Sequence, residues 1–381
     1  MSAPTPTGTE RGPVPEGDGQ RARRRRRFRV IAALLGACVI VAVIVIDRHT
    51  LSESLENLSR LDLRWFAAAL ACEFASLSAF GLSRRRLLRA DGHQVRFPSV
   101  MAITVAGNSV AMSVPFAGAQ LAAAFDYQQL RRRGLDPALT GWALTASAIA
   151  SSSALALVLV TGAFVGGSGV ATAFGFLGAA VFALPGITVI LALRYPKARG
   201  LANRVLAQLL RWAQRLLRRP LLDPAALEEL LERLAAIRLR WPRYLEVFAL
   251  AVANWLGDCA CLACAIYATG GHVPWQGLLL AYGAGAVAGS TGLTPGGFAV
   301  VEVTLTAALV AAGMNAGNAL SAVLAYRLLN FWMILFGGGI TMVILTRARE
   351  HRIRRFTRPK DRPPARAGSG EAGAEQDASG A

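Results

Sequence analysis

The apolar residues of the chain are gathered into long blocks, which are separated by short polar, arginine-rich segments. An α-helix of about 20 residues crosses the hydrocarbon core of a bilayer, so each uninterrupted block predicts one membrane span. The uninterrupted blocks are 30–46, 63–82, 138–165, 171–193, 244–269 and 318–345. This pattern predicts an all-α polytopic membrane protein.

Two further blocks, 97–130 and 275–312, are too long for a single crossing and carry helix breakers near their middles. The first contains Val-Pro-Phe-Ala-Gly at 114–118, and the second contains Gly-Leu-Thr-Pro-Gly-Gly at 292–297. Unpaired backbone groups cannot face lipid, so each break must be buried in protein or line a wet cavity. We therefore expect two broken hairpins of re-entrant or half-spanning helices.

The basic residues predict the orientation of these helices. Lys and Arg number 41 against 23 Asp and Glu, yet they flank the apolar blocks, which favours contact with anionic lipid over nucleic acid. With the N-terminus inside and each hairpin returning to its own side, 37 of the 41 lie in the inside segments 1–29, 83–96, 131–137, 194–243 and 346–381. Both termini are therefore predicted to be cytoplasmic, in a multi-pass protein of the bacterial inner (plasma) membrane.

The order span, broken hairpin, span occurs twice, and the predicted orientation inverts between the two copies. The copies run from 63 to 165 and from 244 to 345, and block 171–193 joins them. Interrupted segments at matching positions of two inverted repeats point to a transporter substrate site near the bilayer midplane. The alternative is a pair of ordinary kinked helices that pack closely through small residues.

Polar residues inside the blocks complete a candidate site. A helix that restarts after a break aims free N–H groups at the cavity, which suits a phosphate or carboxylate. The predicted substrate-binding residues are Pro115, Gly118, Gln120, Thr294, Pro295, Gly296, Gly297, Glu302, Tyr326, Arg327 and Asn330. Glu73 and Asp258 are candidates for proton coupling, because charged groups inside a membrane are costly and usually functional.

The interpretation of Glu302 and Arg327 has a plain structural alternative. Glu302 and Arg327 could form an ion pair that holds the second hairpin to the last span. A further acidic residue, Asp126, lies near a block boundary, where we expect water to solvate it.

The remaining segments predict no further folded domain. Residues 1–29 and 346–381 are expected to be disordered tails around a transmembrane domain at 30–345, and 194–243 is expected to be an amphipathic insert on the cytoplasmic leaflet. The five cysteines lie inside apolar blocks and the four histidines show no metal-ligand spacing, so we expect no metal and no cofactor. No phosphate-binding loop is present, which argues against direct use of ATP.

Residues 293–302, Leu-Thr-Pro-Gly-Gly-Phe-Ala-Val-Val-Glu, resemble the PGG-x-G-x-x-E signature of the lysylphosphatidylglycerol synthase transmembrane-region family, which are flippase-like integral membrane proteins. Tyr326-Arg327 with Phe331-Trp332 resembles the pattern of the family's last span. Residues 115–118, followed by Tyr127 and the run 131–134, resemble its first-half motif. The resemblance covers about 60–345, with Ala299 where the family often has glycine and without the arginine that often follows Gly118 in a G-E-x-x-R pattern.

The resemblance implies a lipid flippase or translocase, not an enzyme, that moves an anionic or aminoacylated phospholipid or a polyprenyl-phosphate lipid between leaflets. Arg327 would contact the phosphate, and Glu302 would hold or compete for this arginine. In the best-known members a cytosolic synthase domain follows and makes the lipid. This chain ends about 35 residues after its last predicted span, so we expect a stand-alone member that is supplied by a separate lipid-synthesising enzyme.

The expected partners are therefore membrane lipids with anionic head groups, and not nucleic acid. Two other functions stay open. The first is a membrane scaffold or accessory subunit of a lipid- or glycan-modifying enzyme, which would dock through 194–243. The second is an intramembrane glycosyl or acyl transferase, for which we find no paired carboxylates or His–Asp arrangement at a membrane face.

Overall fold

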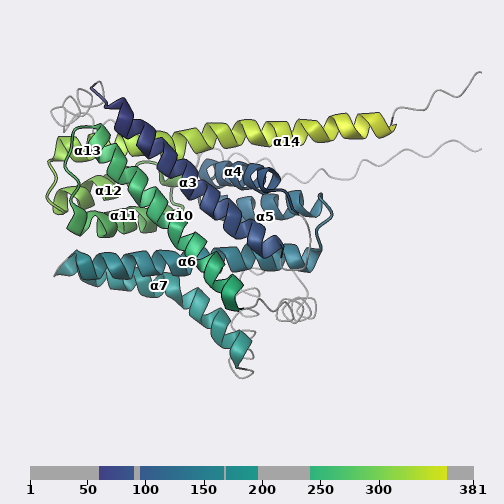
Figure 1. Cartoon of the computed structure of the whole chain (residues 1–381), viewed down its shortest axis with the longest axis horizontal. Helices are drawn as coiled ribbons and strands as arrows, with labels where there is room; N and C mark the ends of the chain where they lie inside the picture. The colour runs from purple at the N-terminus through teal and green to yellow at the C-terminus, as the bar shows by residue number, and fades with distance from the viewer. Residues whose placement is uncertain (1–59, 90–94, 167–168, 196–240, 358–381) are drawn as a thin grey trace, which may run out of the picture.

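The computed structural model describes residues 60–89, 95–166, 169–195 and 241–357, and in these ranges the secondary structure is entirely helical (Figure 1). The predicted first span at 30–46, the tail at 1–29 and most of the insert at 194–243 lie outside the described residues. The predicted all-α architecture is confirmed for the described part of the chain.

Four described helices are long and apolar enough to cross a membrane: Leu63–Leu88, Pro137–Val165, Pro242–Ala268 and Ala316–Arg347. They correspond to α3 (Leu63–Leu88), α6 (Pro137–Val165), α10 (Trp241–Ala268) and the continuous run of α13 (Ala316–Arg327), η2 (Leu328–Met333) and α14 (Ile334–Thr357). A further helix, α7 (Val170–Arg194), follows α6. Each matches a predicted apolar block, which confirms a membrane protein.

The two interrupted blocks form shorter helices, and the breaks lie where Pro and Gly predict them. The first block forms α4 (Phe97–Ser113) and α5 (Gly118–Arg131). The second forms α11 (Trp275–Ser290), the short 3-10 turn η1 (Pro295–Gly297) and α12 (Val300–Ala311). Helices of 12 to 17 residues are about 18–26 Å long, which is less than the roughly 30 Å of the hydrocarbon core.

Three of the described helices, α3, α6 and α13, begin with side-chain caps, whereas the helices that follow the breaks do not. Asp62 and Asp136 accept hydrogen bonds from the first turns of α3 and α6, and Asn315 does the same for α13. At the start of α5 and of α12 no side chain caps the helix. The first N–H groups of these two helices therefore have no side-chain acceptor from the capping position, as a site for an anionic group requires.

The packing of the long helices places the hairpins at opposite ends of the molecule. Helix α3 packs along α10, which runs in the opposite direction, and α6 packs along α7 (Figure 1). Gly257 allows the first contact, because a Cβ at this position would lie 3.2 Å from the Cα of Ser76. Helices α11, α12 and α13 gather at one end of the bundle, and α4 and α5 lie towards the end from which α14 projects (Figure 1).

Two helices extend beyond their apolar blocks, and one contains an irregularity that the pattern did not predict. Helix α3 continues to Leu88 instead of ending at 82, and α14 continues to Thr357 instead of ending at 345. Arginine is a good helix former, so a helix need not end where its apolar block ends. The last span was expected to be a regular α-helix, but Leu328–Met333 is a π-helical turn directly after Arg327. Such turns occur frequently at functional sites.

Candidate functional site

The two breaks touch each other in the middle of the bundle. The backbone N–H of Phe116 donates a hydrogen bond of 2.7 Å to the carbonyl oxygen of Gly292. Phe116 belongs to the first break and Gly292 to the second, so the tips of the two hairpins meet directly. Residues that are 176 positions apart in the sequence thus form one structural feature.

Each hairpin has a strained backbone position at its break. Among the described residues, the non-glycine residues with positive φ are Phe116 (φ 58°) in the first break and Ala299 (φ 66°), two residues after the second. An L-residue in this region costs about 1–2 kcal/mol. Strain of this kind concentrates at functional sites, where the surrounding structure maintains it. The family's glycine at position 299 would adopt this conformation without that cost.

The glycines of the second break are required by conformation and by close packing. Gly296 and Gly297 have φ values of 56° and 69°. A Cβ on Gly296 would overlap the ring of Phe331, and a Cβ on Gly297 would lie 2.6 Å from Val301 Cγ2. The Pro-Gly-Gly sequence therefore lets the break pack against the π-helical turn.

A cavity of about 530 Å³ opens beside the meeting point of the breaks. This volume falls in the range of small-molecule sites. Of the residues predicted from sequence, those that line the cavity are Glu73, Gly118, Gln120, Asp258, Thr294, Gly296, Gly297, Tyr326, Arg327 and Asn330. The structure thus brings together residues from both halves. Pro115, Pro295 and Glu302 are not among the lining residues.

The centre of the cavity wall is a buried carboxylate cluster on α3 and α10. Asp258 accepts hydrogen bonds from the hydroxyl of Tyr282 (2.7 Å), the hydroxyl of Tyr326 (3.1 Å) and the side-chain amide of Asn330 (2.9 Å). The carboxyl group of Glu73, which is 1% exposed, is in hydrogen-bonding contact with that of Asp258. Two acidic side chains, one from each half of the chain, therefore lie together in the wall of the cavity.

Protein groups bind two of the three guanidinium nitrogens of Arg327. Its Nε donates to Glu302 Oε1 at 2.7 Å, and its Nη2 donates to the carbonyl oxygen of Gly296 at 3.0 Å. The guanidinium also lies 4.5 Å from the ring centre of Phe331. The ion pair that was the structural alternative therefore exists, and it joins α12, the second break and α13.

Several polar groups of the cavity were not predicted from the sequence. Tyr282 bonds directly to Asp258, and Ser76 Oγ donates to the carbonyl oxygen of Asn254 at 2.8 Å. Trp255 also lines the cavity, and its indole N–H donates to Ser151 O. A usable signal existed for Tyr282, which is the only tyrosine in the apolar block 275–312. Ser76 resembles the many small residues around it and carries no such signal.

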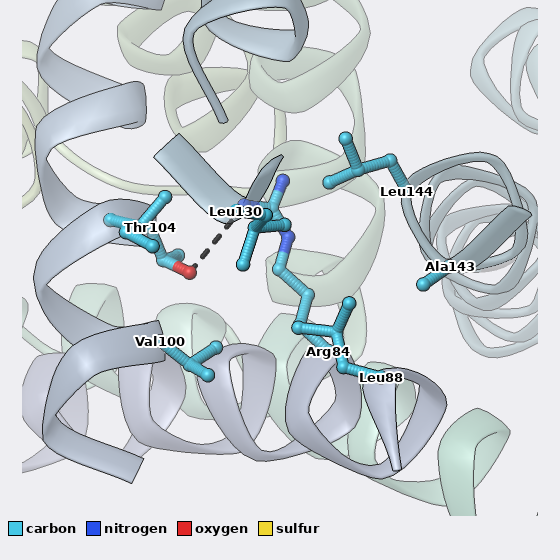
Figure 2. Close-up of a pocket in the computed structure, with 8 residues that line it drawn as sticks. Arg84, Leu88, Val100, Thr104, Leu130, Ala143 and Leu144 are labelled. Carbon is cyan, nitrogen blue, oxygen red and sulfur yellow. Dashed lines mark hydrogen bonds between the residues drawn. The ribbon is translucent and has the colours of Figure 1, made fainter. Parts of the chain in front are cut away.

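The expectation that Asp126 is solvated was wrong. Its side chain is 2% exposed, and Oδ2 lies 2.5 Å from Arg84 Nη1. Figure 2 shows Arg84 between Thr104 and Leu144, beside a small pocket of about 10 Å³. This pocket, which has room for about one water molecule, is lined mainly by apolar side chains and is distinct from the large cavity. Helix α3 extends past its apolar block, so Arg84 stays within the fold and Asp126 pairs with it.

Comparison with known proteins agrees with the motifs. Residues 30–338 match the family described as Lysylphosphatidylglycerol synthase TM region. The match spans both hairpins and the cavity. No curated protein matches the chain.

Proposed function

Because the chain belongs to the Lysylphosphatidylglycerol synthase TM region family, whose members are related to lipid handling, we propose that it is a lipid flippase that moves lipid head groups between leaflets through the large cavity. The observation that carries this proposal is the meeting of the two breaks, Phe116 to Gly292, beside a cavity of about 530 Å³ that polar side chains line in part. A head group that crosses the bilayer needs polar groups inside the protein, because the lipid-exposed surface cannot provide them.

The packing partners of the helices support two related halves. Under the proposed repeat, α3, α4, α5 and α6 correspond to α10, α11, α12 and the run from α13 to α14. Exchanging the halves converts the α4–α14 contact into the α11–α6 contact, and the α5–α6 contact into the α12–α13 contact, all of which are present. Two halves that pack in equivalent ways could rock around the cavity between them and open it to each side in turn.

The charges of the cavity favour an aminoacylated lipid among the candidate substrates. Arg327 is neutralised by Glu302, whereas Glu73 and Asp258 have no cationic partner among the described residues. An ammonium group would therefore be attracted to the carboxylates. The uncapped start of α5, at Gly118 to Gln120, offers N–H groups to the lipid phosphate. A separate enzyme would supply the lipid.

Glu73 and Asp258 are proposed to couple transport to protons. A proton shared between them could leave when an ammonium group arrives, since both compete for the same negative charge. The inner-membrane location and the cytoplasmic termini belong to the same proposal, because they define the two sides between which lipid and proton would move.

A reconstitution experiment tests the function directly. Protein in liposomes that contain fluorescent aminoacylated, anionic or polyprenyl-phosphate lipids should speed leaflet exchange for one of these classes, in a manner that responds to a pH gradient. Asp258→Asn keeps the acceptor for Tyr282 but removes the charge, so exchange should fall by roughly tenfold or more. The matched control is Glu246→Gln, because Glu246 lies on the same helix but its side chain is 40% exposed and pairs with Arg86.

Wild-type exchange that equals protein-free liposomes for all three lipid classes would contradict the flippase proposal and favour the scaffold function. If Asp258→Asn exchanges lipid at the wild-type rate, the protein would still be a flippase, but the carboxylate cluster would have no part in its mechanism.

A further inference from the structure

Each broken hairpin is tied to a neighbouring helix by a buried ion pair. Asp126 on α5 binds Arg84 on α3 at 2.5 Å, and Glu302 on α12 binds Arg327 on α13 at 2.7 Å. The carboxylate of Asp126 is 2% exposed and the guanidinium of Arg327 is 5% exposed. Breaking a buried pair leaves an uncompensated charge, whereas exposed pairs contribute little. These two pairs can therefore fix the positions of the hairpins.

Arg84 connects α3 to both helices of the first hairpin. Its Nη1 binds Asp126 on α5 and donates a longer bond of 3.4 Å to Thr104 on α4 (Figure 2). The guanidinium also lies 4.5 Å from the ring centre of Phe80, which lines the large cavity. On α4, Gly107 leaves room for the Asp126 carboxylate, since a Cβ there would overlap it. Thr104, Phe80 and Gly107 thus surround one ion pair next to the cavity wall.

The position of Asp126 determines the position of the cavity-lining end of α5. Gly118, Ala119 and Gln120 line the cavity, and Asp126 follows Gln120 by six residues, or about 9 Å along the helix. The pair is also incompletely satisfied, because Arg84 Nε and Asp126 Oδ1 have no hydrogen-bond partner among the described residues. Water in an opened cavity could satisfy these two atoms once the charges separate, so the pair can hold α5 against α3 in the closed arrangement and still release it.

We propose that Arg84 and Asp126 are positioning residues that latch the first hairpin against α3. The latch closes the cavity towards the side on which 97 and 131 lie, which is the predicted cytoplasmic side. Its release lets α5 move away and opens the cavity to that side. Glu302 and Arg327 hold the second hairpin against α13, towards the opposite side, and form the second latch. This inference rests on the proposed function, because it treats the cavity as a substrate site with two alternating openings.

Cysteine labelling from each side of the membrane tests the latch without any lipid substrate. The five native cysteines are replaced by alanine, and Gln120→Cys reports the first break while Thr294→Cys reports the second. A membrane-impermeant maleimide is applied to everted and to right-side-out vesicles. Asp126→Asn should raise the labelling rate of Gln120→Cys in everted vesicles by roughly tenfold, because a charge-assisted hydrogen bond is lost. Labelling of Thr294→Cys in right-side-out vesicles should fall or stay unchanged.

The charge-swapped double variant Arg84→Asp/Asp126→Arg should return the labelling rates of both cysteines towards wild type. The control Arg86→Ala, which removes an exposed ion pair on the same helix, should change neither labelling rate. A labelling rate that Asp126→Asn leaves unchanged would overturn the latch, and so would an equal rise from both sides. If Asp126→Asn does not fold, Arg84→Lys is read in the same way, since it keeps the charge but loses the planar guanidinium. A failed lipid-exchange assay with a positive labelling result would reject the flippase and keep the latch.

Discussion

At the scale of single residues, the fold holds Ala299 in a backbone conformation that alanine disfavours. Its φ of 66° and ψ of −36° lie in a region that L-residues rarely adopt, and it directly precedes α12. The turn persists because Gly296 binds Arg327 through its carbonyl oxygen, and Glu302 on α12 binds the same arginine. The two bonds hold the chain on both sides of Ala299, so the strain is maintained by the Arg327 contacts.

Ala299→Gly should therefore stabilise the protein. Glycine removes about 1–2 kcal/mol of strain from the folded state, but it also raises the conformational entropy of the unfolded chain, which opposes folding. The net gain in the free energy of unfolding should be about 1 kcal/mol. The melting temperature in detergent should rise. Ala67→Gly is the matched control, because Ala67 is an exposed residue within helix α3, and it should lower stability by about 0.5–1 kcal/mol. Equal losses for both variants would show that position 299 is not strained.

At the scale of helices, the sequence predicts regular elements and their breaks better than it predicts pairings. Pro115 and Pro295, with their neighbouring glycines, place both breaks correctly, since proline and glycine act locally. The π-helical turn after Arg327 and the Arg84–Asp126 pair were not predicted. Both features depend on which helices pack against each other, and the helix propensities of single residues do not determine that packing. The Glu302–Arg327 pair could be anticipated because both charges lie inside apolar blocks, where a partner is required.

The contact between α12 and α13 separates a structural from a functional role of Arg327. Arg327→Ala alone leaves Glu302 buried without its partner and should cost about 3–5 kcal/mol of stability. The double variant Glu302→Leu/Arg327→Met replaces the pair with apolar side chains of similar volume, so its melting temperature should return close to the wild-type value.

Lipid exchange by that double variant then decides the role. If the double variant is stable but does not exchange lipid, Arg327 has a role in substrate binding or in opening the cavity. If it exchanges lipid at the wild-type rate, Arg327 has only a structural role, and the proposal that Glu302 and Arg327 form the second latch is contradicted.

At the scale of the whole molecule, the cavity exists because separate parts of the chain come together in one place. The tips of both hairpins, the middle of α3 with Glu73, the middle of α10 with Asp258 and the end of α13 with Arg327 meet there. No one segment carries the whole site, which explains why composition alone indicates only a membrane protein. The arrangement has a function in transport only if the two hairpins enter from opposite sides of the membrane.

This orientation makes a prediction that does not depend on the lipid. Arg132→Cys, in the exposed turn after α5, should react with an impermeant maleimide only from the cytoplasmic side, because this turn belongs to an arginine-rich segment. His272→Cys, in the exposed loop between α10 and α11, should react only from the opposite side. Reaction of both cysteines from one side would mean that the hairpins enter together. The halves would then not be inverted, and a cavity between them would have no basis for alternating access.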